Sequence, residues 1–235
     1  RQGVVEQAHQ ELEAFASSLS HDLRAPLASI DALCKGLELD FQEELGESGL
    51  EKIEKISEST TRMGKLIEAV IKLARSSKGD LKPRRLDLSD MAHGIVRELA
   101  AMDPKRQVDV SIAPEMKAHG DPTLLRSVLW NLLANAWKFT ANSPRAKIDI
   151  FTNAFENRGE GFSYYTVEDN GIGFDERYAE KLFQAFARLP GSESFPGFGI
   201  GLASAERIIS RHGGAIGAKA KPNGGASFWF ALPKA

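Results

Sequence analysis

The chain has 235 residues, 42% of them hydrophobic and 26% charged, a composition typical of globular proteins with enough apolar side chains for real cores. Lys and Arg total 30 and Asp and Glu total 32, and the resulting net charge of −2 gives no support to nucleic-acid or membrane binding. The single cysteine, Cys34, excludes an internal disulfide, and no apolar run approaches the roughly 20 residues that a membrane span needs.

The pattern changes near Ser76 and predicts two domains, residues 1–78 and 79–235. The first domain is helical throughout, and its best breaker is the LGESG segment Leu45–Gly49, so we expect a helical hairpin. Apolar residues recur every seven positions on both arms: Ala16, Leu23, Ile30 and Leu37 on the first, and Ile53, Thr60 and Ile67, with Ile56, Met63 and Val70, on the second. One hairpin has too little core to be stable alone, so we predict a homodimeric four-helix bundle. A monomeric hairpin packed on the second domain is the alternative.

The first arm contains the segment SHDLRAPL, residues 20–27. If Leu23 lies at heptad position a, His21 lies at position f and faces away from the seam, where a neutral imidazole can act as a nucleophile. Asp22 can accept a hydrogen bond from the ring and fix its tautomer. Pro26 removes the i+4 donor for the Asp22 carbonyl and predicts a bend. From these residues alone, an exposed His–Asp pair beside a tolerated kink is an equally good interpretation.

From about Arg84 the pattern becomes α/β. Strands are predicted at RLDL, VDVSI, KIDIFT, FSYYTVED, AIGAKA and ASFWFAL, and helices over 89–101, 123–138 and 200–212. We expect a two-layer α+β sandwich in which helices cover one face of a mixed sheet.

The helix predicted from Thr123 carries three polar side chains on one face. Asn131, Asn135 and Lys138 stand at i, i+4 and i+7 and form one stripe. Amide oxygens and an ammonium in a row suit a polyphosphate and its Mg²⁺ ion. The alternative is a solvated helix face, although asparagine is a poor residue for a helix interior.

Two glycine-rich segments lie in the second predicted domain. In VEDNGIGF, Asp169 ends a strand before a turn at Gly171 and Gly173, and it could accept from an exocyclic amine such as that of adenine; a plain turn is the commoner explanation. In FPGFGIGLAS, Gly197, Gly199 and Gly201 precede a helix whose N-terminus favours anions. Loop rather than strand precedes these glycines, so a nucleotide lid fits better than a dinucleotide-binding fingerprint.

Five segments together resemble the conserved boxes of two-component sensor histidine kinases. SLSHDLRAPL resembles the H box, NLLANAWKFT the N box, DNGIGF and GFGIGLA the two glycine boxes, and FQAFARL the F box. The order and spacing of the five boxes match the family over nearly the whole chain. The residues within the boxes are most similar to those of soluble PAS- or phytochrome-linked kinases. The resemblance implies a dimerisation and phosphoacceptor hairpin followed by an ATPase domain of the GHKL (Bergerat) class.

The resemblance also implies a role for each matching residue. His21 is the expected phosphoacceptor, Asp22 its acidic neighbour, and Asn135 the Mg²⁺ ligand. The other implied contacts are Asn131 and Lys138 with phosphates, Asp169 with the adenine amine, Gly171 and Gly173 in that pocket, Phe183 and Phe186 in the lid, Arg188 with the γ-phosphate, and Gly197, Gly199 and Gly201 around the triphosphate.

Two positions depart from the family pattern. Ala25 stands where the family often has Thr or Asn, so we expect weak phosphatase activity towards the partner. Phe198 stands where a small residue is usual, and the sequence leaves open whether it covers the nucleotide or crowds the lid.

The implied function is ATP-dependent autophosphorylation of His21 and transfer to an aspartate of a response-regulator receiver domain. The implied cofactors are ATP and Mg²⁺. The alternatives are a nucleotide-binding pseudokinase that serves as a dimeric scaffold, a chaperone- or repair-type GHKL ATPase, and a serine/threonine kinase of the same class. The chain begins with Arg1, so we expect a fragment whose missing upstream part carries the sensor. We expect the chain itself to be cytoplasmic.

Overall fold

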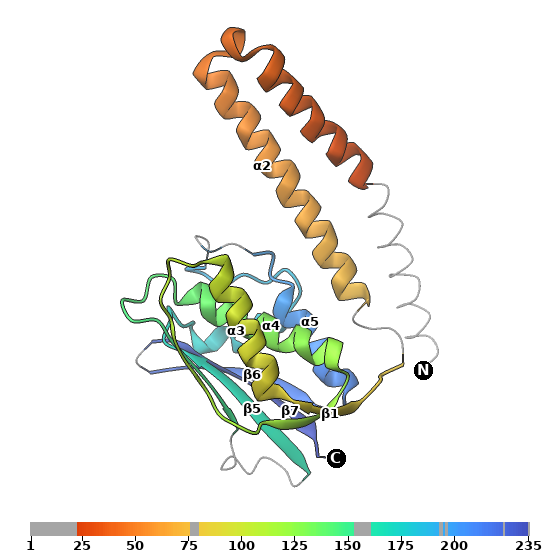
Figure 1. The fold of residues 1–235 in the computed structure, drawn as a ribbon, viewed down its shortest axis with the longest axis vertical. Coiled ribbons are helices and arrows are strands. Elements are labelled where there is room, and N and C mark those ends of the chain that lie inside the picture. The colour runs from red at the N-terminus through yellow and green to blue at the C-terminus, as the bar shows by residue number, and fades with distance from the viewer. Residues whose placement is uncertain are drawn as a thin grey trace. The chain divides into compact units, whose positions relative to one another are not determined.

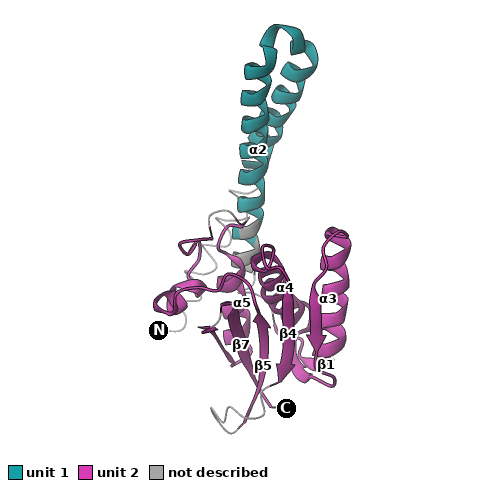
Figure 2. Ribbon diagram, turned by 90° about the vertical axis from the view of Figure 1, so that its left-hand side faces the viewer, with its two compact units in different colours: residues 1–75 teal, residues 76–235 magenta. Residues whose placement is uncertain are grey.

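The computed structural model describes residues 23–75, 80–152, 161–192, 195, 197–222 and 224–234. The chain divides into two compact units, Arg1–Arg75 and Ser76–Ala235 (Figure 2). Among the described residues, no helix combines the length and apolar character needed to cross a membrane.

The first unit is a helical hairpin, as predicted (Figure 1). One arm is helical over 23–40, and the second is α2, Gln42–Arg75. The chain bends at Phe41, and Gly46 is non-helical with φ 60°. The turn at Gly46 therefore lies inside the predicted loop Leu45–Gly49, although the last residues of that loop are helical. The two arms contact each other, because Ser57 Oγ donates to Asp31 Oδ1 across the hairpin at 3.0 Å.

Apolar side chains of the hairpin fall into two groups. Leu27, Cys34, Ile53, Thr60 and Ile71 are buried within the single chain. A second group of large side chains is exposed: Leu23, Ile30, Leu33, Leu37, Leu39, Phe41, Ile56, Met63 and Leu66. Several of these lie at the predicted heptad positions, so one copy of the hairpin leaves much of its heptad surface uncovered.

The second unit contains a five-stranded mixed sheet in the order β2-β4-β5-β7-β6. Its strands are β2 (Asp109–Ile112), β4 (Lys147–Thr152), β5 (Phe162–Asp169), β6 (Ala215–Ala220) and β7 (Ala226–Pro233). The β2–β4 pair is parallel and the other pairs are antiparallel. Strands β1 (Arg84–Asp87) and β3 (Lys117–Gly120) form a separate antiparallel pair.

Three α-helices pack against the sheet: α3 (Leu88–Met102), α4 (Pro122–Phe139) and α5 (Gly201–Arg211). Asp87 and Asp121 cap the first two by accepting hydrogen bonds from backbone N–H groups of the first turn, and Pro122 at N1 suits the start of α4. The N-cap of α5, Ile200, makes no side-chain capping bond. The inner faces of these helices and of the sheet share one core.

The helical hairpin and the α/β sandwich are both confirmed, with three differences in detail. The strand predicted at RLDL pairs with β3 rather than joining the main sheet. The sequence KAHG of β3 is too short and too polar to be recognised as a strand, and it is held by its partner Arg84–Asp87. A 3-10 helix, η1 (Glu176–Phe183), follows the first glycine turn and was not predicted.

Candidate nucleotide site

The polar stripe predicted on one helix lies along the middle and end of α4. Asn131, Asn135 and Lys138 are all half-buried, whereas the opposite face of the helix is in the core. The stripe is therefore held at the surface of the second unit by the burial of its own helix.

Asn131 lies against the first residue of α5. A Cβ added at Gly201 would be 2.8 Å from Asn131 Oδ1, so a residue without a side chain is needed at this approach. Asn131 Nδ2 is buried and has no hydrogen-bond partner within the described part of the chain. A buried amide of this kind costs about 1–3 kcal/mol unless something pairs with it, so a polar ligand or water is expected beside it.

Lys138 lies at the C-terminal end of the stripe. Its Nζ is 4.1 Å from the centroid of the Phe139 ring, and the backbone of Gly197 lies beside the same ammonium. Burial, followed by the positive charge of Arg188, lowers the pKa of Lys138 to about 8. A cation held partly out of water next to another cation is poised to receive phosphate oxygens.

Asp169 ends β5 and is almost completely buried. Its Oδ1 accepts from the N–H of Gly171 at 2.8 Å. Burial raises the pKa of Asp169, and the N–H groups of Gly171 and Ala226 oppose that rise. A buried carboxylate with oxygen capacity to spare is suited to accept from an amine.

The turn after Asp169 packs on the end of α4. A Cβ added at Gly171 would lie 2.5 Å from the Phe139 carbonyl oxygen, and Ile172 N donates to that same oxygen at 3.2 Å. Gly173 lies against the backbone of Gly225, in the β6–β7 connection. These contacts bring the first glycine turn beside the helix that carries the polar stripe.

The F box and the second glycine box are joined by their backbones. Phe186 N donates to Gly199 O at 2.9 Å, and a Cβ added at Gly199 would collide with the Ala187 carbonyl oxygen at 2.4 Å. Phe183 is buried, whereas Phe186 has φ 66° and an exposed ring. The backbone of Phe186 therefore makes the contact with the glycine segment.

Arg188 belongs to the F box and lies close enough to Lys138 of α4 for its charge to act there. Its Nη2 donates to the carbonyl oxygens of Ser192 and Phe195, at 2.6 and 2.9 Å, and its charge acts on Lys138. Phe198 is half-buried.

The predicted site residues thus fall into two groups. Those of the second unit gather around the end of α4, the glycine turn after β5 and the N-terminus of α5. His21 and Asp22 lie outside the described residues, and so does the Asp22 carbonyl at which the bend was predicted; Pro26 itself lies within the helical segment 23–40.

Sequence reasoning missed several residues that shape this region. The Phe139 and Phe195 rings pack with centroids 5.2 Å apart. Arg106 Nη2 donates to Thr140 Oγ1 at 2.7 Å, its Nη1 donates to the Trp137 carbonyl, and it thereby satisfies the C-terminal end of α4. Arg106 lies about 30 residues before the end of α4, so no local sequence pattern indicates that it pairs with the helix terminus.

Comparisons with known proteins agree with this arrangement. The model "His Kinase A (phospho-acceptor) domain" matches residues 11–79, and the model "Histidine kinase-, DNA gyrase B-, and HSP90-like ATPase" matches residues 120–235. The chain belongs to the histidine kinase family. Phytochromes are among the relatives, as the residues of the boxes predicted.

Three relatives illustrate the similarity. Cyanobacterial phytochrome B of Nostoc sp. is 32% identical over 97% of this chain and 30% of its own length. Phytochrome-like protein Cph1 of Synechocystis sp. is 30% identical with the same coverages. Adaptive-response sensory kinase SasA of Thermosynechococcus vestitus is 30% identical over 94% of this chain and 60% of its own length. The chain thus spans less than two thirds of these relatives.

Solved structures share the fold. Full-length ShkA, crystallised with AMPPNP, matches with a TM-score of 0.68 at 23% identity, over 94% of this chain and 46% of its own. Mycobacterial sensor histidine kinase MprB matches with a TM-score of 0.55 at 22% identity, over 64% of this chain and 97% of its own.

The donor set around α4 fits a magnesium ion that is held largely by its substrate. Among the described residues, no three His, Cys, Asp or Glu side chains cluster as metal ligands. Asn135 offers one amide oxygen, and Mg²⁺ typically takes one or two protein ligands together with substrate phosphates and water.

Proposed function

We propose that the chain is the catalytic core of a sensor kinase that transfers the γ-phosphoryl group of ATP to His21 and then to an aspartate of a response regulator. The observation that carries the nucleotide part is the unpaired, buried amide of Asn131 against the N-terminus of α5, with Lys138 further along the same stripe. Both matched family models support the assignment.

The residues of the second unit bind and orient ATP in this proposal. Asp169 accepts from the adenine amine, while Asn131, Lys138 and the free N–H groups at the start of α5 hold the phosphates. Asn135 would hold Mg²⁺, which when bound would neutralise charge on the phosphate oxygens. Arg188 moves from its carbonyl partners to the γ-phosphate.

His21 attacks the γ-phosphorus in line through one neutral ring nitrogen, and Asp22 accepts a hydrogen bond from the other. The bond from the γ-phosphorus to the bridging oxygen breaks, and ADP leaves with that electron pair. The protein contributes positioning and charge stabilisation rather than covalent chemistry of its own. The phosphoryl group then passes from histidine to a carboxylate of the partner.

The exposed heptad side chains of the hairpin support a homodimer as the working unit. Leu23, Ile30 and Leu37 repeat every seven residues, and each is about 40% exposed in one copy. Two hairpins that pack these stripes together form a four-helix bundle.

The test is transfer of labelled γ-phosphate from ATP–Mg²⁺ to the purified chain, beside His21→Ala and Asn135→Ala. Acid-labile, base-stable label on the parent alone is the expected result. A control, Lys105→Gln, changes an exposed cation away from the site and should leave labelling intact.

Two outcomes would contradict the proposal. Label that survives acid would indicate a hydroxyl acceptor and a serine/threonine kinase. Nucleotide binding without any label, in the dimeric chain, would favour the pseudokinase alternative.

A further inference from the structure

A cavity lies in the second unit, called the ATPase unit from here on, away from the proposed nucleotide site. Its volume is about 540 Å³, and it is lined by β1, β3, the first residues of β5 and the end of β7. Ser163, which lines it, is six residues before Asp169 on the same strand, a separation of roughly 20 Å for an extended chain. A ligand here would not overlap one bound at Asp169.

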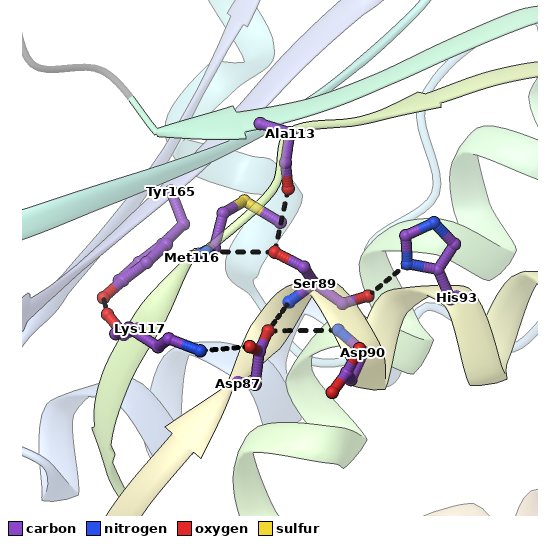
Figure 3. Close-up of polar contacts among 8 residues, drawn as sticks. All are labelled: Asp87, Ser89, Asp90, His93, Ala113, Met116, Lys117 and Tyr165. Atoms are coloured by element: carbon purple, nitrogen blue, oxygen red, sulfur yellow. Dashed lines mark hydrogen bonds and ion pairs between the residues drawn. The ribbon is translucent and has the colours of Figure 1, made fainter.

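Hydrogen bonds between elements hold the cavity wall in place (Figure 3). Tyr165 of β5 donates its hydroxyl to the carbonyl oxygen of Lys117 on β3. Ser89 Oγ on α3 donates to Ala113 O at 2.8 Å and accepts from Met116 N at 3.0 Å. These bonds fix β3, which lines the cavity, to β5 and, through the residues just before β3, to α3.

The rim of the cavity carries more positive than negative charge. Arg85, Lys117 and Lys234 line it together with one carboxylate, Asp87. Asp87 Oδ1 already accepts from the N–H groups of Ser89 and Asp90, and its Oδ2 pairs with Lys117.

The other two cations keep their charge available. Neither Arg85 nor Lys234 has an ion-pair partner among the described residues, and both are exposed. The cavity therefore combines two uncompensated cations with an apolar part formed by Leu86, Ala118 and Pro233.

We propose that this cavity binds a small organic anion with an apolar body, such as an aromatic carboxylate, sulfonate or phosphate monoester. The volume lies within the roughly 300–1,000 Å³ of small-molecule sites. The apolar part receives the body of the ligand, and Arg85 and Lys234 pair with its charged group.

The probe is 8-anilinonaphthalene-1-sulfonate, titrated by fluorescence into the whole chain with saturating ADP present. Replacing both rim cations in Arg85→Gln/Lys234→Gln should weaken the fitted affinity about tenfold, since two charge-assisted contacts are lost. The neutral dye N-phenyl-1-naphthylamine, which has the same aromatic body, should bind the parent more weakly and should not respond to the double substitution.

Two further variants keep the test decisive. Arg97→Gln/Lys105→Gln removes two exposed cations of the same unit outside the cavity and should change the affinity less than about twofold, as expected for distant surface charges. Ser163→Leu adds an apolar side chain at a half-buried lining position while keeping the charge of the cavity, and it should also weaken sulfonate binding. Equal loss in both double variants, or unchanged sulfonate binding in Arg85→Gln/Lys234→Gln and in Ser163→Leu, would overturn the proposal.

Discussion

Helices in both units have an apolar face, but the two units differ in how much of that face is buried within a single chain. In α4, the apolar side chains Leu125, Val128, Leu129, Leu132, Leu133, Ala136 and Trp137 are all buried by neighbours in the same unit. In the hairpin, Leu33 is 66% exposed and Met63 is 51% exposed. Helix α4 of the ATPase unit buries its apolar face within one chain. The hairpin leaves large apolar side chains exposed, and a second copy could cover them. Assembly and nucleotide binding should therefore respond to separate mutations.

The largest expected effect is on assembly. Ile30→Glu places a carboxylate in the exposed heptad stripe of both copies and should raise the dimer dissociation constant at least about 100-fold, because each buried Ile is worth about 1.5–3 kcal/mol. Sedimentation equilibrium measures it. Affinity for AMPPNP should not change, because the proposed nucleotide contacts all lie in the second unit.

Glu54→Gln is the matched control, since Glu54 is exposed on α2 and lies outside the predicted seams. It should leave the dimer intact. An Ile30→Glu chain that dimerises as well as the parent, or a parent that is monomeric at micromolar concentration, would remove the contrast between the units.

The second prediction concerns the core of the ATPase unit. Leu132 is fully buried in the α4 core, so Leu132→Ala should destabilise the ATPase unit by about 2–5 kcal/mol. Denaturant unfolding, followed by Trp fluorescence, measures it, because Trp130, Trp137 and Trp229 all lie in this unit. The dimer constant in native buffer should stay within a factor of about two, as for independent sites. A large rise in that constant would show that the units are coupled.

The sequence predicted most of this fold because its signals are local. Period-seven and alternating patterns indicated the hairpin and the main strands, and the Asp–Pro pair at 121–122 indicated where α4 begins. Strand β3 was not predicted, because its four residues form a strand through pairing with β1 and not through their own β-propensity. The turn of the hairpin lies at Gly46, inside the predicted loop, but it is shorter than predicted because only Gly46 leaves the helical region, while Gly49 stays in it.

The site was predictable where residues share one element or one motif. Asn131 and Lys138 share a helix face, so their spacing alone placed them together. Arg106 and Phe195 reach the same helix end from distant segments, and only tertiary contacts show this. The positive φ and the exposed ring of Phe186 could not be predicted either, because a bulky residue rarely adopts a positive φ.

The third prediction uses the lowered pKa of Lys138, about 8 in the free protein. Phosphates favour the charged ammonium, so binding above pH 8 must first restore a proton. Affinity for AMPPNP should be full below pH 7 and fall as pH rises through 8, by about tenfold between pH 7 and 9. Calorimetric titration across this range measures it.

Lys138→Arg is the control for that profile, because a guanidinium stays charged throughout this range. Its profile should be flat between pH 7 and 9. A tenfold fall that persists in Lys138→Arg would assign the titration to another group and leave Lys138 outside the phosphate site.

The smallest expected effects come from a pair of glycines in the ATPase unit. Gly201→Ala adds a Cβ that would lie 2.8 Å from Asn131 Oδ1 and displaces that amide, whereas Gly94→Ala, on α3, meets nothing within 4 Å. Losing one hydrogen bond to nucleotide should raise the KM for ATP about fivefold in Gly201→Ala. Gly94→Ala should leave KM unchanged and stabilise the unit by about 0.5–1 kcal/mol, through helix propensity alone. Initial rates and denaturant titrations of both variants separate the two effects. An equal KM in both would mean that the close approach of α5 to Asn131 has no part in holding the nucleotide.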